Sequence, residues 1–201
     1  RLVAGAQALR TVGVNRYPGA YDTRPQWGDF ADMLITNTWR PSLATLGRGG
    51  APKIHYAGNT LRPGTSAKLV FRLPPTLDAG QAAAEIKTIF EADPPNGARV
   101  EFELEPAQSG WYVPRIEHWL EASLQKASGE YFGKPCMHMG MGGTIPFMKM
   151  LNDAYPETQF MVTGVLGPKS NAHGPNEFLH TDTGKRITGC VARVLYDHAM
   201  R

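Results

Sequence analysis

The sequence is poor in cysteine, in long apolar runs and in net charge. Its 201 residues include two cysteines, Cys136 and Cys190, too few for the disulfide framework of a small secreted protein. No run approaches the ~18 consecutive apolar residues of a membrane-spanning helix. The 21 basic and 18 acidic residues leave a net charge of +3, too small and too dispersed to indicate nucleic-acid binding. We therefore expect neither nucleic acid nor a membrane as a partner, and a reducing, cytoplasmic location.

Internal repeats and low-complexity tracts are also absent, whereas glycine and proline are frequent. With 22 Gly, 16 Pro and 42% hydrophobic residues, the composition is typical of a loop-rich globular protein and excludes disordered, collagen-like and coiled-coil chains. Residues 1–40 contain only brief apolar runs and are expected to be mostly irregular. The chain starts with Arg1, so we expect a processed, truncated or excised polypeptide.

Alternating polar and apolar residues predict a small α+β domain before residue 113. Strands are expected at residues 42–46, 53–56, 68–73 and 100–105, and a helix after the capping-box pair Asp78 and Gln81. In the third strand Leu69, Phe71 and Leu73 share one face, because side chains two apart in a strand point the same way. Arg72 is therefore predicted to point away from the core.

After residue 113 helices alternate with apolar runs, as in an α/β domain. Helices are expected at 116–129, 146–154 and 187–198, and a buried strand at 160–163. In open α/β sheets ligands bind in the loops that follow the carboxyl ends of strands. The polar loop 164–176 has that position, and its His173 is a candidate metal ligand. A surface histidine bonded to the backbone is the alternative for the same residue.

A second candidate site is the glycine-rich turn 140–146, which opens onto a predicted helix. Free backbone amides at a helix amino end, together with the Thr144 hydroxyl, would bind a carboxylate or a phosphate. The turn lacks the Gly-Lys-Ser/Thr ending of a nucleotide-binding phosphate loop. A simple tight turn with Thr144 as helix cap is the alternative.

Three motifs follow one another along residues 58–179. They are Gly-Asn-Thr-Leu-Arg-Pro at 58–63 with Phe-Arg-Leu-Pro at 71–74, Gly-Gly-Thr-Ile-Pro at 142–146, and Ser-Asn-Ala-His-Gly-Pro-Asn-Glu-Phe-Leu at 170–179. Their order and separation resemble the carboxyl-terminal part of the dinuclear zinc peptidases of the aminoacylase, carnosine dipeptidase and acetylornithine deacetylase family. The resemblance implies an α/β fold with a ferredoxin-like α+β lid and dimerisation domain, here residues 1–113. Residues 114–201 would be the carboxyl-terminal part of the α/β catalytic domain.

The resemblance also implies roles for individual residues. His173 would be a zinc ligand, and Glu177 would support its loop. The substrate-binding residues would be Asn59, Thr60, Arg72, Gly143 and Thr144. Among them, Arg72 would meet an anionic carboxylate through paired hydrogen bonds, in agreement with its predicted place off the core face.

The activity implied is hydrolysis of a peptide or amide bond by water activated at two zinc ions, with manganese or cobalt as alternative metals. The substrate would be a small peptide or an N-acyl amino acid, and the lid would form a homodimer. The family's other metal ligands and its general base come from an amino-terminal half that is not found in this sequence. We therefore expect a carboxyl-terminal fragment that is inactive alone. A noncatalytic dimerisation or binding module is the alternative function.

Overall fold

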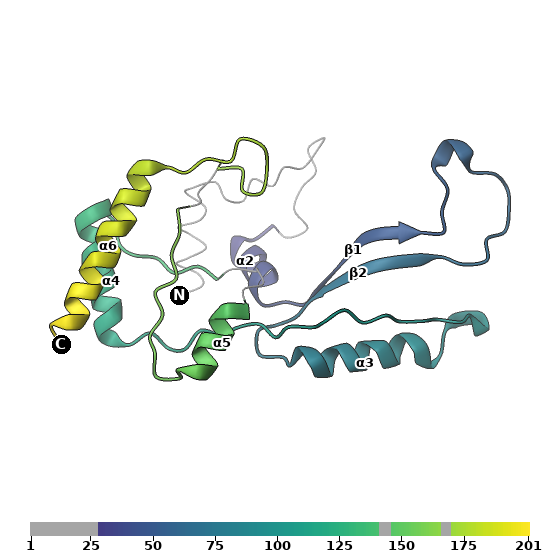
Figure 1. The fold of residues 1–201 in the computed structure, drawn as a ribbon, viewed down its shortest axis with the longest axis horizontal. Coiled ribbons are helices and arrows are strands. Elements are labelled where there is room, and N and C mark those ends of the chain that lie inside the picture. Colours follow the sequence, from purple (N-terminus) through teal and green to yellow (C-terminus); the bar gives the residue numbers. More distant parts are fainter. Residues whose placement is uncertain (1–27, 141–145, 166–169) are drawn as a thin grey trace. The chain divides into compact units, whose positions relative to one another are not determined.

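The computed structural model describes residues 28–140, 146–165 and 170–201. These residues belong to two compact units (Figure 1). The strand unit contains residues 35–111 and 146–149, and the helix unit contains residues 28–34, 112–140, 150–165 and 170–201. In this described part of the chain no helix is long and apolar enough to cross a membrane.

Helix α2 (Phe30–Thr38) is the first described element. Asp29 precedes it, and the Asp29 Oδ2 accepts the backbone N–H groups of Ala31 at 3.0 Å and Asp32 at 3.1 Å. These N–H groups are among those that a helix leaves unpaired at its start. The capped helix differs from the mostly irregular structure expected for residues 1–40.

Strands β1 (Ser42–Gly49) and β2 (Ser66–Arg72) form a two-stranded antiparallel sheet in the strand unit. Their register places Ser42 opposite Arg72. Along β2, Leu69 and Phe71 are half-buried, whereas the residues that follow each of them are exposed. The predicted alternation is therefore confirmed, and Arg72 lies on the exposed side.

The loop between β1 and β2 contains the short 3-10 helix η1 (Ile54–Tyr56), where a strand was expected. Its backbone bonds are local: the Tyr56 N–H donates to the Lys53 carbonyl at 2.9 Å, and the Ala57 N–H donates to the Ile54 carbonyl at 3.1 Å. These bonds satisfy backbone groups that a strand would pair with a neighbouring strand. The strand predicted at residues 53–56 is therefore wrong.

Helix α3 (Ala79–Ala92) begins where the capping-box spacing predicted. The Asp78 carboxylate accepts the backbone N–H of Gln81 at 2.8 Å. The buried residues of the helix are all small: Ala79, Ala82 and Ala83. Towards its carboxyl end, the Phe90 ring packs edge-on against Phe71 of β2, with 6.4 Å between the ring centroids. This contact joins the helix to the sheet.

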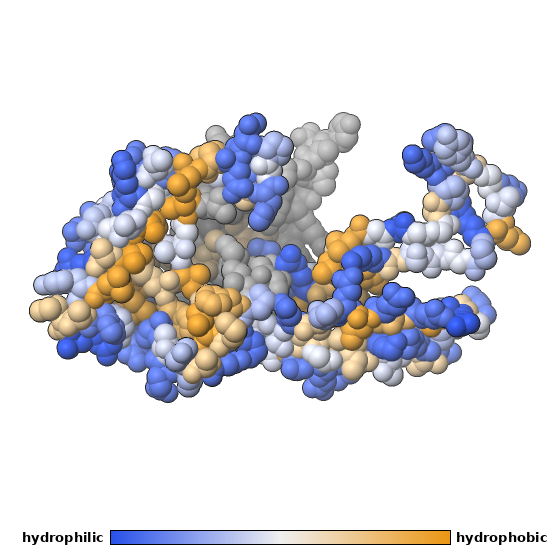
Figure 2. All heavy atoms as spheres, in the orientation of Figure 1, coloured by the Kyte–Doolittle hydropathy of each residue, from blue (hydrophilic) through white to orange (hydrophobic). Residues whose placement is uncertain are grey.

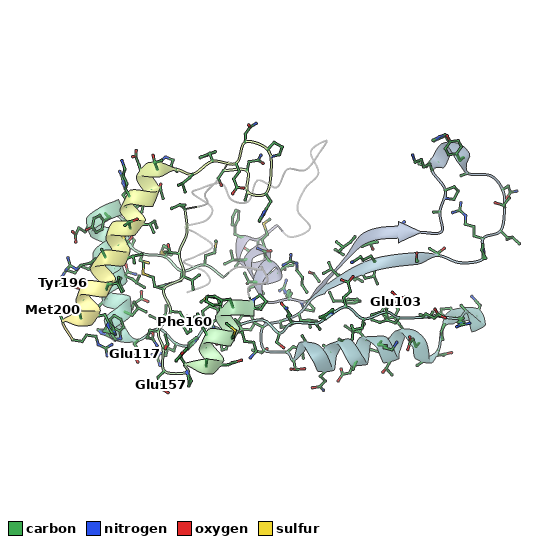
Figure 3. All side chains as sticks on the ribbon, viewed as in Figure 1. Glu103, Glu117, Glu157, Phe160, Tyr196 and Met200 are labelled. Carbon is green, nitrogen blue, oxygen red and sulfur yellow. The ribbon has the colours of Figure 1, made fainter. Side chains whose placement is uncertain are left out.

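Residues 100–105 run beside α3 (Figure 1), and the predicted strand is not formed there. The Glu91 Oε1 accepts the backbone N–H of Phe102 at 2.8 Å and the Lys87 Nζ at 2.7 Å. The Lys87 Nζ also donates to the Phe102 carbonyl at 2.8 Å. Side chains of α3 thus satisfy backbone groups that a neighbouring strand would have paired. Glu103, labelled in Figure 3, is exposed on the same segment.

Helices α4 (His118–Phe132) and α6 (Thr181–Ala199) form the core of the helix unit. The buried side chains of this core are Leu120, Leu124 and Val194. The sequence predicted that α4 ends at Gly129, but the helix continues to Phe132. Gly133 ends it with a φ of 66°, and the Gly133 N–H donates to the Gly129 carbonyl. A Cβ atom is sterically strained in this left-handed conformation, and glycine is favoured at the cap because it has none.

A polar layer also connects α4 and α6. The Ser123 hydroxyl donates to the Asp197 Oδ2 at 2.8 Å, and the Arg193 Nε donates to the Asp197 Oδ1 at 3.0 Å. The Arg193 Nη1 donates to the Glu130 Oε2 at 3.1 Å. Apolar side chains also lie along the exposed side of α6 (Figure 2). Figure 3 labels Tyr196 of this helix and Met200, the residue that directly follows it, and both are exposed.

Helix α5 (Pro146–Ala154) has the bounds that the sequence predicted. The buried strand predicted at residues 160–163 is wrong, because no strand forms there. Met161 packs against the helical core, but Val162 is 60% exposed. Within the described ranges, the two strands β1 and β2 pair with each other. Residues 160–163 therefore have no strand partner there, and a strand needs one.

Candidate functional site

The loop that leads into α6 carries unusual backbone geometry. We call residues 170–178 the histidine loop. Asn171, His173 and Asn176 have φ values of 56°, 62° and 60°. Left-handed backbone is uncommon for residues other than glycine, and it is concentrated at ligand-binding and catalytic positions. Three such residues within one short loop therefore mark it as a candidate site.

The histidine loop is closed by its own hydrogen bonds. At its neck the Phe178 N–H donates to the carbonyl of the buried Ser170 at 3.2 Å. Inside it the Gly174 N–H donates to the Asn171 carbonyl at 2.9 Å, and the Asn171 Nδ2 donates to the Pro175 carbonyl. These bonds hold His173 at the exposed tip of a closed turn.

The carboxylate of Glu177 contacts the backbone of His173. The His173 N–H donates to the Glu177 Oε2 at 3.1 Å. The bond uses the main chain of His173 and does not involve its imidazole ring. Glu177 thus holds the loop while the His173 ring stays exposed, which is the geometry that a supporting residue needs. The metal-binding role of His173 stays a prediction.

The residues expected to bind substrate from the lid lie in the strand unit. Asn59 and Thr60 are exposed in the loop between β1 and β2, where the Thr60 N–H donates to the Gly58 carbonyl at 2.9 Å. Arg72 is the last residue of β2 and is exposed. Gly143 and Thr144 lie outside the described residues. Of the five residues predicted to bind substrate, the structure therefore places three, and all three lie in the strand unit.

The described residues contain part of the chemistry that a metal site needs. Histidine is a suitable zinc ligand, and the exposed ring of His173 fits that chemistry. A zinc site needs about three protein ligands, however. Among the residues that the structure describes, no three His, Cys, Asp or Glu side chains are grouped so that they could hold a metal ion. The described residues thus supply one candidate ligand and do not by themselves fit a whole site.

A polar cluster that the motifs did not indicate holds the chain after α4. The His138 Nε2 lies 3.0 Å from the Glu121 Oε2. Gln125 makes two hydrogen bonds to the backbone of Cys136. Its Nε2 donates to the Cys136 carbonyl, and its Oε1 accepts the Cys136 N–H, each at 3.0 Å. Glu121 and Gln125 are four residues apart on α4, and this spacing on one helix face is the signal that could have found them.

The thiol of Cys136 is not set up as a nucleophile. Burial raises its pKa, and the charges of Glu121 and Cys190 raise the pKa further. A raised pKa keeps a thiol protonated at neutral pH, whereas a reactive cysteine needs its thiolate. The cluster is therefore assigned to holding residues 136–138 against α4.

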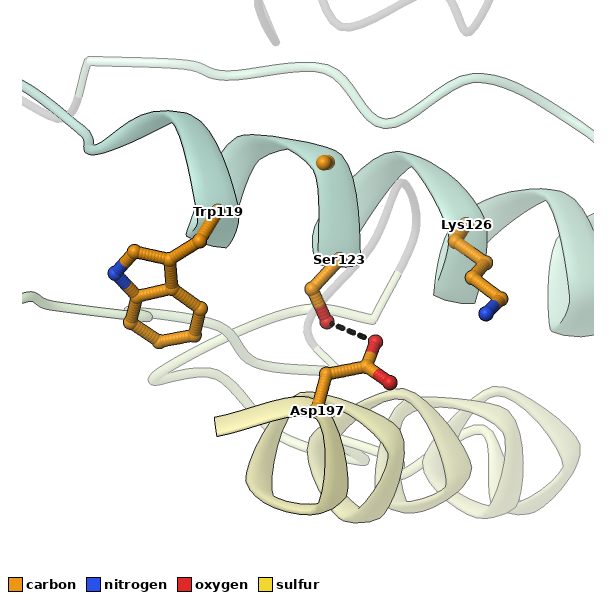
Figure 4. Close-up of a pocket in the computed structure, with 5 residues that line it drawn as sticks. Trp119, Ser123, Lys126 and Asp197 are labelled. Carbon is orange, nitrogen blue, oxygen red and sulfur yellow. Dashed lines mark hydrogen bonds between the residues drawn. The ribbon is translucent and has the colours of Figure 1, made fainter. Parts of the chain in front are cut away.

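A shallow hollow of about 280 Å³ lies between α4 and α6 (Figure 4). It is lined by Trp119, Ala122, Ser123, Lys126 and Asp197. The Asp197 carboxylate faces the Ser123 hydroxyl, which lowers the pKa of Asp197, and Arg193 lowers the pKa in the same direction. Because both oxygens of Asp197 already accept hydrogen bonds, the hollow belongs to the packing of the two helices.

Comparisons with known proteins define a class for this fold. No family model matches the chain. Its structure is similar to the di-peptidase Dug1p from Saccharomyces cerevisiae, with a TM-score of 0.67, 21% identity and coverage of 87% of this chain and 37% of that one. It is also similar to an M20 family metallo-carboxypeptidase from Sulfolobus solfataricus, with a TM-score of 0.67, 16% identity and coverage of 94% and 41%. The chain therefore has a partial M20 peptidase fold.

Two further relatives are dipeptidases. The chain is 29% identical over 181 residues to the cysteinylglycine-S-conjugate dipeptidase of Corynebacterium striatum. This match covers 88% of the chain and 35% of the relative. Human carnosine dipeptidase 1 matches with a TM-score of 0.62 and 17% identity, over 87% of this chain and 37% of that one. The chain thus spans about a third of the length of this curated relative. These matches confirm the resemblance drawn from the three motifs and the mixed α/β fold with a small antiparallel sheet.

Proposed function

We propose that this chain is part of a metal-dependent hydrolase that cleaves a peptide or amide bond, of the dipeptidase or N-acyl amino acid deacylase type. The observation that carries the proposal is the similarity to a dipeptidase over 88% of the chain. The noncatalytic module is not favoured, because the relatives found by sequence and by structure are dipeptidases and a carboxypeptidase.

In this proposal His173 donates a ring nitrogen to zinc, or to manganese or cobalt in its place, and Glu177 holds the backbone of His173. Zinc supplies a Lewis acid that lowers the pKa of water and polarises a carbonyl. Two such ions are expected in the complete enzyme, with the remaining ligands and the general base contributed from outside the described residues. The described residues hold one candidate metal ligand, and the chain spans 35% of the relative. We therefore expect the 201-residue chain to be a carboxyl-terminal fragment that is inactive alone.

The substrate is proposed to be a small peptide or an N-acyl amino acid with a free carboxylate. Arg72 would bind that carboxylate, because a guanidinium group matches it with two parallel hydrogen bonds. Thr144 would share the carboxylate with Arg72, and Asn59, Thr60 and Gly143 would be further substrate-binding residues. Homodimerisation through the strand unit and a cytoplasmic location complete the proposal.

The test is the variant His173→Ala in the complete polypeptide that carries this sequence. We expect a fall in zinc content, measured by elemental analysis, and nearly complete loss of dipeptide or N-acyl amino acid hydrolysis, because a metal ligand is removed. His118→Ala is the matched control, since His118 is an exposed histidine at the start of α4. Equal zinc content in His173→Ala and the parent would show that His173 is an ordinary surface histidine.

His180 is less suitable as a control. Its Nδ1 accepts the backbone N–H of Thr183 at 3.2 Å, so the side chain caps the amino end of α6. Loss of a helix cap costs about 0.5–2 kcal/mol of stability. A change in His180→Ala would therefore mix folding with metal binding, which the His118 control avoids.

A further inference from the structure

The side chain of Asn171 crosses the histidine loop. Its Nδ2 donates to the Pro175 carbonyl, and its backbone carbonyl accepts the Gly174 N–H at 2.9 Å. A Cβ atom added to Gly174 would lie 2.7 Å from the Asn171 Nδ2, so the carboxamide packs directly against the Gly174 backbone. Asn171 thus bonds to Gly174 through its backbone and to Pro175 through its side chain, and these bonds close the turn that contains His173.

Asparagine suits this position for two reasons. It adopts left-handed backbone more readily than most residues other than glycine, and Asn171 has a φ of 56°. Its carboxamide also carries a donor, which an aspartate of the same size lacks. His173 itself has a φ of 62°, and such a conformation persists where the surrounding contacts hold it.

We propose that Asn171 is a positioning residue for His173. Its carboxamide keeps the turn from Asn171 to Pro175 closed, holds the His173 backbone left-handed, and so sets the direction in which the imidazole leaves the loop. Asn171 acts through the main chain and does not itself touch a metal. The inference rests on the proposed function, in which His173 is a metal ligand.

Glu177 bonds the same stretch of backbone. The Asn171 bond to the Pro175 carbonyl and the Glu177 bond to the His173 N–H each join residues four apart, and the two spans overlap from His173 to Pro175. Groups that orient a metal ligand through hydrogen bonds typically contribute about 10- to 100-fold to metal affinity. Loss of the Asn171 donor is therefore expected to weaken zinc binding while the helical core stays intact.

The test compares Asn171→Asp with Asn96→Asp in the complete polypeptide. Asn171→Asp keeps the size of the side chain and its tolerance of left-handed backbone, but it removes the donor to Pro175. Asn96 is the matched control, because it is also an asparagine with a positive φ, 58°, in the strand unit. The measurements are amide hydrogen exchange of His173 and Gly174 without metal, zinc affinity, and the melting temperature of the metal-free protein.

We expect Asn171→Asp to speed exchange of both amides by about five- to tenfold, the effect of losing one ordinary hydrogen bond. Zinc affinity should fall by about 10- to 100-fold, with the melting temperature nearly unchanged. Asn96→Asp should alter none of the three quantities. A variant that merely loosened the fold would instead lower the melting temperature and leave zinc affinity at the parent value.

Unchanged exchange at His173 and Gly174 in Asn171→Asp would overturn the inference. Faster exchange with unchanged zinc affinity would also overturn it, provided that His173→Ala does lose zinc, and the proposed function would then stand. If His173→Ala itself retained full zinc affinity, the proposed function and the positioning role that depends on it would fail together.

Discussion

The helix unit and the strand unit are stabilised by different kinds of contact. In the helix unit Leu120, Leu124 and Val194 form a buried apolar cluster between two helices. In the strand unit the buried residues of α3 are alanines, and the neighbouring segment is attached through Glu91. The helix unit therefore depends on the burial of branched apolar side chains, whereas part of the strand unit depends on polar bonds to the backbone.

The two units share one electrostatic feature. In the strand unit Lys87 lowers the pKa of Glu91, and the bond from the Phe102 N–H lowers it further. In the helix unit the Ser123 hydroxyl and then Arg193 lower the pKa of Asp197. A lowered pKa means that the folded state favours the ionised carboxylate. The units thus differ in apolar packing but both use an ionised carboxylate as an acceptor.

The largest effect on stability is expected from Leu120→Ala in the helix unit. Leu120 is 2% exposed within the apolar cluster. Removing a buried leucine side chain costs about 2–5 kcal/mol, since apolar contacts are lost and a cavity is left. The control is Leu195→Ala, because Leu195 lies on the same helix pair but is 65% exposed. Similar losses in the two variants, measured by urea denaturation, would refute the assignment of the core.

A smaller effect, on catalysis, is expected from Arg72→Lys at the end of β2. Lysine keeps the charge but loses the paired hydrogen bonds to a carboxylate. The loss of about 1.5–3 kcal/mol would lower kcat/KM about tenfold to more than a hundredfold in the complete enzyme. The melting temperature should hardly change, because Arg72 lies on the exposed side of the strand.

Two comparisons sharpen the Arg72 experiment. Arg48→Lys is the matched control, since Arg48 is an exposed arginine on the neighbouring strand β1. A substrate with a free carboxylate is compared with its amide, and the loss in kcat/KM should be confined to the carboxylate. Equal losses on both substrates, or a large fall in melting temperature, would assign Arg72 to the fold instead of the substrate.

The smallest effect is expected from Glu91→Gln, which tests the polar attachment in the strand unit. Glu91 has a lowered pKa in the folded state, so its contribution to stability is present above its ordinary value of 4.5 and is lost as pH falls through the folded pKa. The protection of the Phe102 amide against hydrogen exchange should therefore decline with acid in the parent. In Glu91→Gln it should already be reduced at neutral pH and respond less to acid.

Glu85→Gln controls for the loss of a carboxylate from α3, because Glu85 accepts a bond from Gln81 within the same helix. This variant should retain the acid dependence of Phe102 protection. If Glu91→Gln and the parent lost protection over the same pH range, the bond between Glu91 and Phe102 would not be what attaches residues 100–105.

The sequence singled out the loop that carries His173 and a supporting role for Glu177, whereas the hydrogen bonds of Asn171 inside that loop were not predicted. The polar loop before a helix indicated His173 as a candidate ligand, and Glu177 was indicated by the resemblance of the motif at 170–179. The role of Asn171 was missed. Its bond to Pro175 exists because the chain turns back through left-handed residues, and asparagine in a loop is compatible with many other turns.

The sequence by itself determined the elements whose causes are local. The cap at Asp78, the alternation along β2 and the bounds of α5 depend on residues within a few positions of one another. Only the tertiary structure determined the conformation of residues 100–105 and 160–163. Both segments have strand-like sequences but do not form strands. An alternating or apolar pattern shows that a segment can be a strand, but pairing requires a partner from elsewhere in the chain. In the first of these segments the contacting backbone groups are instead satisfied by side chains of α3.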